Sequence, residues 1–262
     1  MGWKKGMKSI STVHSRVQES DLNMPREALH LEDIRKTYIN GELQVPVLKG
    51  VDMHIDHGEF VCIMGSSGAG KSTMLNILGL LDKPTSGTYR LNGQNVAELS
   101  DKELTTLRNI RIGFVFQSFN LCPHLTVQEN IEVPMLYSEV PRRKRHKIAR
   151  ILADKVKLSH RLDHRPTQLS GGECQRVAIA RSLVNNPTFI LADEPTGNLD
   201  EKTGTEILGV FHELHRAGTT IIMVTHNPSY EGICDRVFWL RNGRMWKIID
   251  NIAGKTTEFD CP

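Results

Sequence analysis

The stretch Gly65 to Ser72 has the sequence GSSGAGKS, which matches the phosphate-loop pattern G-x-x-x-x-G-K-[ST] at every fixed position. The apolar run FVCIM, residues 60–64, predicts a buried strand before the loop. The run MLNIL, residues 74–78, predicts a buried helix after it. A helix N-terminus and a ring of backbone N–H groups form a site for a nucleotide phosphate. The alternative is a glycine-rich turn that holds a lysine by chance, but the flanking strand and helix favour a nucleotide-binding α/β core.

The residues of this loop have distinct expected roles. The glycines leave the backbone bare enough to wrap around a phosphate, and Lys71 brings a positive charge to the outer phosphates. The hydroxyl of Ser72 is a candidate ligand of magnesium. The residues that we expect to bind the nucleotide here are Gly65, Ser66, Ser67, Gly68, Ala69, Gly70, Lys71, Ser72 and Thr73.

The composition is that of a globular protein with a sizeable core. The 262 residues are 39% hydrophobic, which suits one large α/β domain or a core with a smaller subdomain. The longest apolar runs have strand length, whereas a membrane-spanning helix needs about 20 apolar residues, so we expect no span in this chain. The five cysteines are scattered without a C-x-x-C pair, and they predict neither a disulfide framework nor a zinc site. A reducing compartment is the default expectation.

Positive charge is concentrated in one segment. The net charge is only +3, yet residues 142–165 contain ten Lys and Arg against two Asp. Ile148, Ile151, Leu152 and Val156 form an apolar stripe at helical spacing, so the charges fit the solvated face of an amphipathic helix. The other interpretation is a surface for anionic lipid headgroups or an acidic partner.

Periodicity and turn residues predict the order of elements along the chain. The capping-box pairs Ser100/Glu103 and Thr126/Glu129 each predict the start of a helix. We expect Pro134 to interrupt the second helix and Pro141 to start the next one. The expected strands are residues 29–34, 51–55, 88–91, 112–116, 189–192 and 220–224, followed by a hairpin of 237–240 and 245–249 around Asn242-Gly243.

These elements predict a division of the chain. Residues 1–26 lack a periodic pattern and are expected to form a flexible N-terminal arm. Residues 27–262 are expected to form a single nucleotide-binding domain. A small helical subdomain, about residues 118–169, is expected to be inserted into its α/β core.

Two further segments carry chemistry. Leu169 to Glu173 (LSGGE) places a serine and two glycines before an apolar-periodic helix, which predicts either a second anion site or an ordinary helix N-cap. The strand at 189–192 ends in Asp193 and Glu194. Asp193 can hold magnesium, and Glu194 can accept a proton from a water that attacks the terminal phosphate. The alternative is a pair of loop acids that cap the following turn.

With its phosphate loop, and with LSGGE followed by Gln175-Arg176, the chain from about Leu29 to Ile249 resembles the ATP-binding cassette (ABC) ATPases. The resemblance implies a P-loop NTPase core of α/β class, with an N-terminal antiparallel β subdomain and an inserted α-helical subdomain. The segments LLDKPTSG, residues 80–87, and PTGNLD, residues 195–200, resemble the macrolide-efflux and lipoprotein-release type in particular.

The resemblance also implies roles for single residues. Tyr38 matches the aromatic that stacks on adenine, although a strand-end tyrosine packed on the core is the alternative. Gln117 matches the glutamine that touches magnesium and the attacking water, and His226 matches the switch histidine at the γ-phosphate. Asp200 matches the loop that communicates across the dimer. The implied catalytic set is Glu194, His226 and Gln117, the implied metal set is Ser72, Gln117 and Asp193, and Ser170, Gly171 and Gly172 bind the nucleotide of the partner subunit.

The implied cofactors are ATP and Mg²⁺. The implied partners are a second ATPase subunit in a head-to-tail dimer and a separate transmembrane permease, with no nucleic acid. The implied location is the cytoplasmic face of the membrane, where the chain drives export or the extraction of a lipoprotein or lipid. The alternatives are a regulatory switch without transport, as in cell division, and a nucleic-acid-directed ATPase.

Two details of the sequence add hypotheses. Cys174 stands where the family more often has a polar or basic residue, in a first helical turn that can lower a thiol pKa, and the alternative is an inert buried thiol. Phe119, Leu121, Pro123 and Leu125 are more apolar than a free loop needs. They fit either a groove for a helix of the membrane partner or a hydrophobic hinge of the helical subdomain.

Overall fold

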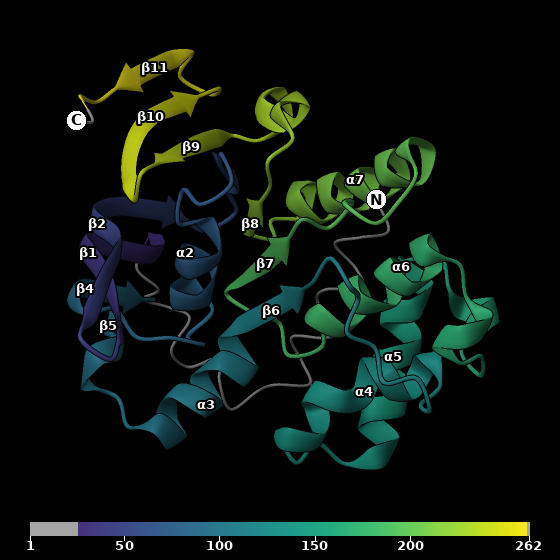
Figure 1. The fold of residues 1–262 in the computed structure, drawn as a ribbon. Helices are drawn as coiled ribbons and strands as arrows, with labels where there is room; N and C mark the ends of the chain where they lie inside the picture. Colours follow the sequence, from purple (N-terminus) through teal and green to yellow (C-terminus); the bar gives the residue numbers. More distant parts are fainter. Residues whose placement is uncertain (1–25, 261–262) are drawn as a thin grey trace.

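The computed structural model describes residues 26–260, so nearly all of the predicted N-terminal arm lies outside the described residues. Two sheets and six α-helices form the fold within this range (Figure 1). The helices are α2 (Lys71–Leu78), α3 (Asp101–Arg111), α4 (Val127–Tyr137), α5 (Arg142–Lys155), α6 (Gly171–Ser182) and α7 (Glu201–Arg216). No helix in this range combines the length and the apolar character that crossing a membrane requires.

The larger sheet carries the α/β core. Its order is β11 (Lys255–Glu258), β10 (Arg244–Asp250), β9 (Arg236–Arg241), β3 (Phe60–Gly65), β8 (Ile221–Val224), β7 (Phe189–Asp193) and β6 (Ile112–Val115). The strands from β9 to β6 run parallel to one another, and β10 and β11 extend the sheet as an antiparallel hairpin. The hairpin around Asn242-Gly243 is confirmed, whereas polar and exposed β11 gave no strand pattern in the sequence.

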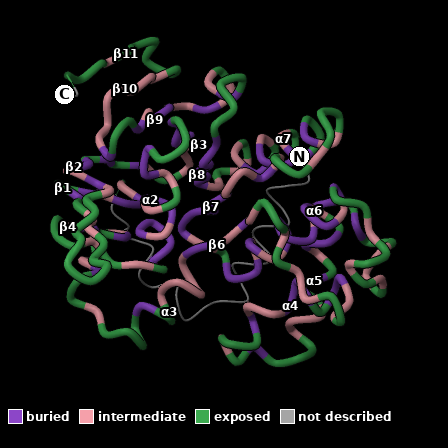
Figure 2. Tube along the Cα trace, viewed as in Figure 1, coloured by how far each residue is buried: buried purple, intermediate pink, exposed green. Residues whose placement is uncertain are grey.

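Alternate residues of the central strands face two different apolar layers. In β3, Phe60, Cys62 and Met64 belong to one core cluster, while Val61 and Ile63 belong to the other. Helix α7 packs into the first layer and α2 into the second, which places these helices on opposite sides of β7 and β8 (Figure 1). Because both faces are covered, the strands are apolar without interruption, and Figure 2 shows the buried chain gathered at the centre of the molecule.

The smaller sheet covers the α2 side of the core. It is antiparallel, in the order β2 (Leu43–Asp56), β1 (Glu27–Asn40), β4 (Ser86–Leu91) and β5 (Gln94–Asn95). Its inward residues, such as Ile34 and Val51, share the core cluster with Met74 and Ile77 of α2. This sheet is the antiparallel β subdomain that the resemblance implies.

Helices α4 and α5 follow β6 and precede α6 in the sequence, and both pack against α6. Val127, Ile131 and Met135 of α4 join Ile148 and Leu152 of α5 in one buried cluster. Within residues 26–260, four short 3₁₀ segments occur, at Val96–Glu98, Ser159–Arg161, Pro166–Gln168 and Pro228–Ile233. The helical insertion is therefore present.

The prediction that Pro134 interrupts the second helix is wrong. Helix α4 continues through Pro134 to Tyr137. Val127, Ile131 and Met135 recur every four residues and are fully buried, so their packing holds the helix across the proline. Tertiary burial of this kind outweighs the loss of one backbone hydrogen bond.

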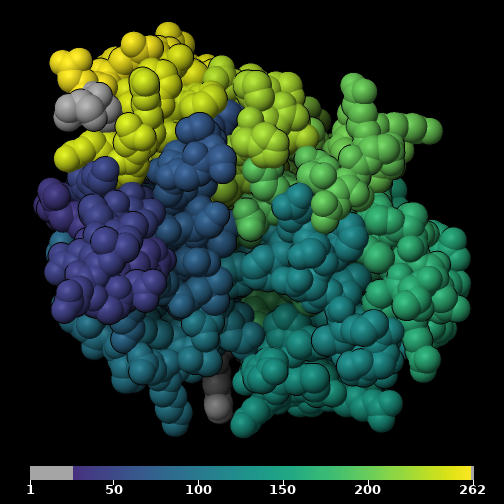
Figure 3. Space-filling view, viewed as in Figure 1, coloured from purple at the N-terminus to yellow at the C-terminus, as the bar shows by residue number. Residues whose placement is uncertain are grey.

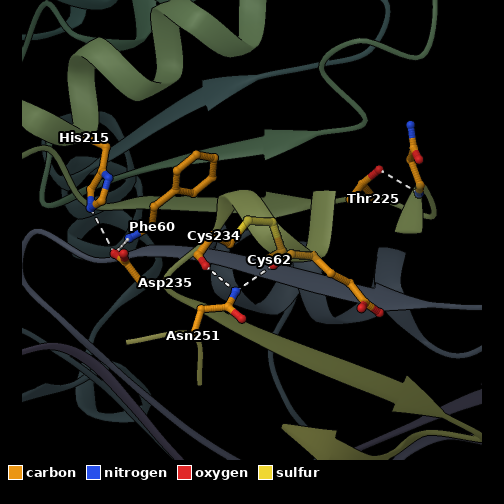
Figure 4. Close-up of a disulfide and its surroundings, with 9 residues drawn as sticks. Phe60, Cys62, His215, Thr225, Cys234, Asp235 and Asn251 are labelled. Atoms are coloured by element: carbon orange, nitrogen blue, oxygen red, sulfur yellow. Dashed lines mark hydrogen bonds and ion pairs between the residues drawn. A yellow bond between two sulfur atoms is a disulfide. The ribbon is translucent and has the colours of Figure 1, made fainter. Parts of the chain in front are cut away.

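The expectation of no disulfide is also wrong. Cys62 in β3 and Cys234 just before β9 are joined by a disulfide, with 6.1 Å between their Cα atoms (Figure 4). The two cysteines are 172 positions apart, so no local spacing indicates the pairing. The parallel pairing of β3 with β9, in which Cys62 lies opposite Val237, brings them together.

Asp235 joins three elements beside this disulfide. Its carboxylate accepts a hydrogen bond of 2.8 Å from the Phe60 amide and lies 2.9 Å from Nε2 of His215 at the end of α7 (Figure 4). Its own amide donates to the Phe60 carbonyl at 2.7 Å. This side chain therefore connects the start of β3 to β9 and α7.

We expect Asp235→Ala to lower the free energy of unfolding by about 1–3 kcal/mol, because the buried Phe60 amide loses its acceptor. Urea unfolding followed by circular dichroism measures this change. Asp163→Ala, at an exposed aspartate, serves as the control and should stay within about 0.5 kcal/mol of the original protein. Equal losses in the two variants would contradict the assigned role of Asp235.

Candidate nucleotide-binding site

The predicted site residues come from four neighbouring parallel strands. Ile63 of β3 pairs with Val224 of β8, Asp193 of β7 also pairs with Val224, and Val115 of β6 pairs with Ala192. The segments that follow these strands carry the phosphate loop, His226, Glu194 and Gln117, respectively. Since the carboxyl ends of parallel strands meet at one edge, the fold gathers these groups there, as is typical of ligand sites in open α/β sheets.

The phosphate loop ends in a helix N-terminus without a side-chain cap. Gly70 is the N-cap residue of α2, with φ of 104°, a conformation that favours glycine. No acidic residue lies in the first turn of α2, whereas α3, α4 and α6 each begin with a complete capping box. The first N–H groups of α2 therefore have no acceptor from a cap, and together with the helix dipole they suit an anion.

Lys71 lies within the curve of this loop. Its ammonium donates to the carbonyl oxygens of Gly65 at 2.7 Å and Ser66 at 2.9 Å. These contacts hold a positive charge over the uncapped helix end. The uncapped helix end and the ammonium of Lys71 both favour a bound anion, which fits a phosphate chain.

Glu194 is held by two residues that follow β8. Its Oε1 lies 2.6 Å from Nδ1 of His226, and its Oε2 accepts a hydrogen bond of 3.2 Å from the Thr225 hydroxyl. The backbone of Glu194 has a φ of 42°, and its amide donates to the Val224 carbonyl at 2.9 Å. A non-glycine residue in this conformation carries strain, a frequent feature of functional sites. The carboxylate is thus fixed in direction at the end of β7.

Asp193 precedes Glu194 and is half-buried at the end of β7. Burial and the neighbouring charge of Glu194 raise its pKa, and the charge of Lys71 acts in the opposite direction. A nearby cation would favour the charged form of this carboxylate. Asp193 and Lys71 therefore belong to one electrostatic unit, which links the phosphate loop to the end of β7.

Gln117 contacts the loop that follows Glu194. Its side-chain amide donates to Oδ1 of Asn198 at 3.2 Å, and the Asn198 amide donates to the Gln117 carbonyl at 3.0 Å. This pair fixes the chain just beyond β6 against the loop before α7. Gln117 is exposed, so its side chain remains accessible from the sheet edge.

The LSGGE segment starts α6 with a capping box. The Ser170 hydroxyl accepts from the Glu173 amide at 3.3 Å, while Glu173 accepts from the Ser170 amide at 2.8 Å. Ser170 is therefore the N-cap residue of α6. Gly172 lies against the start of α7, where an added Cβ would overlap Thr203. Ser170 and Gly171 are exposed, so this helix end faces outward.

Asp200 caps α7 in the same region. Its carboxylate accepts from the Thr203 amide at 3.0 Å and from the Thr203 hydroxyl at 2.6 Å. These hydrogen bonds lower the pKa of Asp200. Because Gly172 and Asp200 both contact Thr203, the start of α6 and the loop before α7 form one surface.

Tyr38 lies near the end of β1 in the smaller sheet, whereas Glu194 follows β7 of the larger sheet. Its hydroxyl donates to Asp82 at 2.9 Å, and the Lys36 ammonium lies 4.8 Å from the centre of its ring. Its strand partner is Val45 on β2, and the following part of β2 contacts Gly70 through Val47 and Leu48. The ring is thus oriented by polar contacts and is 38% exposed, unlike a tyrosine packed in the core.

The structure decides against an activated thiol at Cys174. The residue is buried, and its Sγ donates to the Pro166 carbonyl at 3.7 Å. Burial and the neighbouring charge of Glu173 raise the pKa of this thiol, so the proposed lowering at the helix N-terminus is wrong. The alternative of an unreactive thiol holds instead.

A groove lies beside the segment that follows Gln117, but different residues line it. Leu121 packs on the core cluster, and the Phe119 carbonyl accepts from Arg181, so these two residues fit the hinge interpretation better. The groove has a volume of about 740 Å³ and lies between α3 and α4. Its lining includes Leu81, Thr105, Phe116, Asn120, Pro134 and Tyr137. Figure 3 shows a hollow between the parts of the surface that carry these helices.

Several contributors to the site had no clear signal in the sequence. Thr225 and Asn198 are small polar residues in loops, and only their position next to His226 and Leu199 could have singled them out. Gly243, in the β9–β10 turn, donates from its amide to the Ala69 carbonyl at 3.1 Å and accepts from the Lys49 amide at 2.8 Å. This turn therefore fastens the phosphate loop to β2, although it is distant in sequence.

Known proteins share this arrangement. The family model of the ABC transporters matches residues 48–197. An uncharacterized ABC transporter ATP-binding protein of Thermotoga maritima is 51% identical over 84% of this chain and 94% of its own length. The macrolide export ATP-binding/permease protein MacB of Brucella melitensis is also 51% identical, over 83% of this chain, which spans only 34% of that protein.

Among solved structures, a dimeric ATP-binding cassette in a post-hydrolysis state, bound to ADP and Pi, superposes with a TM-score of 0.77. It is 43% identical and covers 85% of this chain and 98% of its own. The resemblance inferred from the phosphate loop and LSGGE is thereby confirmed, as is the fold that it implied. The chain belongs to the ABC transporter family and is an ATP-binding cassette that hydrolyses ATP.

Proposed function

We propose that this cassette is the ATPase subunit of an export or extraction complex in which two copies bind ATP head to tail and drive a separate membrane subunit. The observation that carries the proposal is that the N-termini of α2 and α6 differ and could bind the same nucleotide from two subunits. The start of α2 is uncapped and carries Lys71, while the exposed start of α6 has a glycine pair and the outward-facing Ser170. A second copy that presents its Ser170, Gly171 and Gly172 would cover the phosphates from the other side.

The names of relatives support transport over a regulatory switch. MacB of Brucella melitensis is named for macrolide export and combines an ATP-binding part with a permease. The matching solved cassette is dimeric. We propose that here the permease is a separate chain, and that the cassette is held at the membrane through it. Residues 27–262 would act as one domain, with the helical subdomain at about 118–169.

The residues at the sheet edge fit a nucleotide with Mg²⁺. The uncapped start of α2 and the ammonium of Lys71 suit the phosphates, and Ser72 and Thr73 follow in its first turn. Asp193, whose pKa is raised by burial and by Glu194, suits a cation, with Ser72 and Gln117 as the other proposed ligands. When bound, Mg²⁺ would neutralise part of the phosphate charge.

The proposed catalytic step rests on Glu194. Its carboxylate accepts a proton from the water that attacks the terminal phosphate. His226 and Thr225 orient this carboxylate from one side, and the strained backbone aims it beyond the end of β7. Gln117, braced by Asn198, positions the water, and Tyr38 stacks on adenine. Loss of the γ-phosphate releases the contacts across the dimer, which then opens.

We also propose that the groove beside α4 receives a cytoplasmic helix of the membrane subunit. Residues of both α3 and α4 line the groove, so a helix bound there would contact both helices and would be affected by their relative position. Leu81 is half-exposed at its rim, an apolar contact point of the kind that helix-in-groove recognition uses. Substrate choice would then reside in the membrane subunit.

Glu194→Gln tests the catalytic assignment. ATP hydrolysis should slow by about 10²–10⁴-fold because the base is lost, while ATP binding persists and a closed dimer accumulates. Phosphate release and size-exclusion chromatography with Mg-ATP measure the two effects. Glu213→Gln, at an exposed residue of α7, is the control and should match the original protein. Unchanged turnover in Glu194→Gln would refute the assignment.

Lys71→Ala tests the phosphate site independently of catalysis. ATP affinity should fall about ten- to hundredfold, since one charged hydrogen bond contributes about 1.5–3 kcal/mol. Isothermal titration calorimetry gives the dissociation constant directly. Lys255→Ala on β11 removes an equal charge far from the loop and should leave affinity unchanged. The site would be wrongly placed if both variants bound ATP equally well.

Leu81→Asp tests the groove. The substitution puts a charge at an apolar contact and should abolish co-purification with the membrane subunit, while basal ATPase activity stays within about twofold because surface changes are usually mild. Affinity purification from native membranes is the measurement. Leu43→Asp, which alters another exposed leucine in the β1–β2 hairpin, is the control. A complex that assembles normally with Leu81→Asp would remove the groove from the interface.

A further inference from the structure

The outer face of α5 forms a cationic surface that the nucleotide site does not use. Arg143, Lys147 and Arg150 are exposed and spaced at i, i+4 and i+7, so they lie on one face of the helix. The opposite face, with Ile148, Ala149, Leu152 and Ala153, is buried in the core cluster. The apolar stripe predicted from the sequence thus explains why this helix packs, but it does not explain why the outer face is almost purely basic.

Few acidic groups neutralise this face. Glu132 is buried and lies near Arg145 and His146, and Asp154 accepts a hydrogen bond from Ser159 at the far end of α5. Among residues 26–260, no carboxylate forms an ion pair with Arg143 or Lys147. An ordinary solvated helix face alternates charges of both signs, whereas this one keeps a net positive potential.

Exposed apolar side chains adjoin these charges. Leu136 is 50% and Tyr137 is 79% exposed at the end of α4, and α5 begins five residues after Tyr137. We define the basic corner as Leu136, Tyr137, Arg142, Arg143, Lys147 and Arg150. A tyrosine beside arginines and lysines is the combination found where proteins meet the headgroup layer of a membrane, because the ring accepts both apolar and polar surroundings.

The basic corner continues the rim of the groove. Pro134, Tyr137 and Ser138 line the groove, and Tyr137 also belongs to the corner. If a cytoplasmic helix of the membrane subunit sits in the groove, as the proposed function requires, the corner lies next to the point where that subunit leaves the bilayer. The position of the corner beside the bilayer and its positive charge therefore both favour contact with the membrane surface.

We propose that the basic corner binds anionic phospholipid headgroups on the cytoplasmic leaflet around the membrane subunit. The inference rests on the proposed function only for the position of the corner next to the bilayer. Its chemistry comes from Arg143 and Lys147, which form no ion pair within the described residues, and from the exposed Tyr137 and Leu136. An acidic protein segment would need only the charges, and nucleic acid would not require the two apolar side chains. The lipid interface is the partner that uses all six residues.

Sedimentation with vesicles tests this proposal on the full chain. Vesicles of phosphatidylcholine that contain about a third of anionic phosphatidylglycerol should bind the chain at low salt and release it as salt rises, because salt screens the attraction. Vesicles of phosphatidylcholine alone should bind it weakly. In the triple variant R143Q/K147Q/R150Q, partitioning should fall about a hundredfold, since each basic residue near an anionic surface contributes about fivefold.

Matched variants separate the surface from net charge and from folding. R90Q/R216Q/K255Q removes the same charge from exposed residues elsewhere and should keep most of the binding. R143K/K147R/R150K retains every charge and should bind as the original chain does. Leu136→Ser, at an exposed residue of the corner that does not line the groove, should weaken binding without altering its salt dependence. Basal ATPase activity should be the same in all of them, which shows that the cassette is intact.

Besides absent binding to the anionic vesicles, three results would overturn the proposal. These are equal binding to both kinds of vesicle, an equal loss in the two triple glutamine variants, and a stronger affinity of the same corner for duplex DNA than for the anionic vesicles at one salt concentration. None of these results would change the assignment of the nucleotide site. Loss of ATPase activity in Glu194→Gln together with absent vesicle binding would leave the proposed function standing and remove only the lipid interface.

Discussion

The alignment of four parallel strands is the constraint on which the candidate site depends. β3, β8, β7 and β6 are held in register by continuous backbone pairing, and β3, β8 and β7 are buried on both faces. Their carboxyl ends therefore cannot shift relative to one another without breaking two apolar layers at once. Lys71, Glu194, His226 and Gln117 come from distant parts of the sequence, and this shared edge keeps them within one small region.

Helix α2 begins differently from helices α3, α4 and α6, and this difference favours an anion at its N-terminus. Helices α3, α4 and α6 satisfy their first amides with their own side chains, in boxes built from a serine or threonine and a glutamate. Helix α2 starts at Gly70 and has no such cap, so its amides and the ammonium of Lys71 point toward a common place. A helix end left in this state is stabilised most when a phosphate arrives, which couples ligand binding to the local order of the loop.

Much of this architecture follows from local patterns. The strands at 60–65, 189–193 and 221–224, the capping boxes and the Asn242-Gly243 hairpin are determined by residues close together in sequence, and they were predictable for that reason. The passage of α4 through Pro134 and the disulfide of Cys62 with Cys234 depend on tertiary packing and were not. The lining of the groove and the partners of Gln117 and Glu194 arise where separate segments meet, so spacing alone could not reveal them.

The β9–β10 turn has a consequence for how the protein folds during its synthesis. The amide and carbonyl of Gly243 brace the phosphate loop from a part of the chain that is synthesised more than 170 positions after that loop begins. Domains begin to fold from the N-terminus while the ribosome is still translating. A nascent chain that has just completed GSSGAGKS therefore possesses the loop but lacks the hydrogen bonds of Gly243, which form only with the β9–β10 hairpin. Premature termination before residue 243 would leave a polypeptide with all of the proposed catalytic side chains and a phosphate loop without this support.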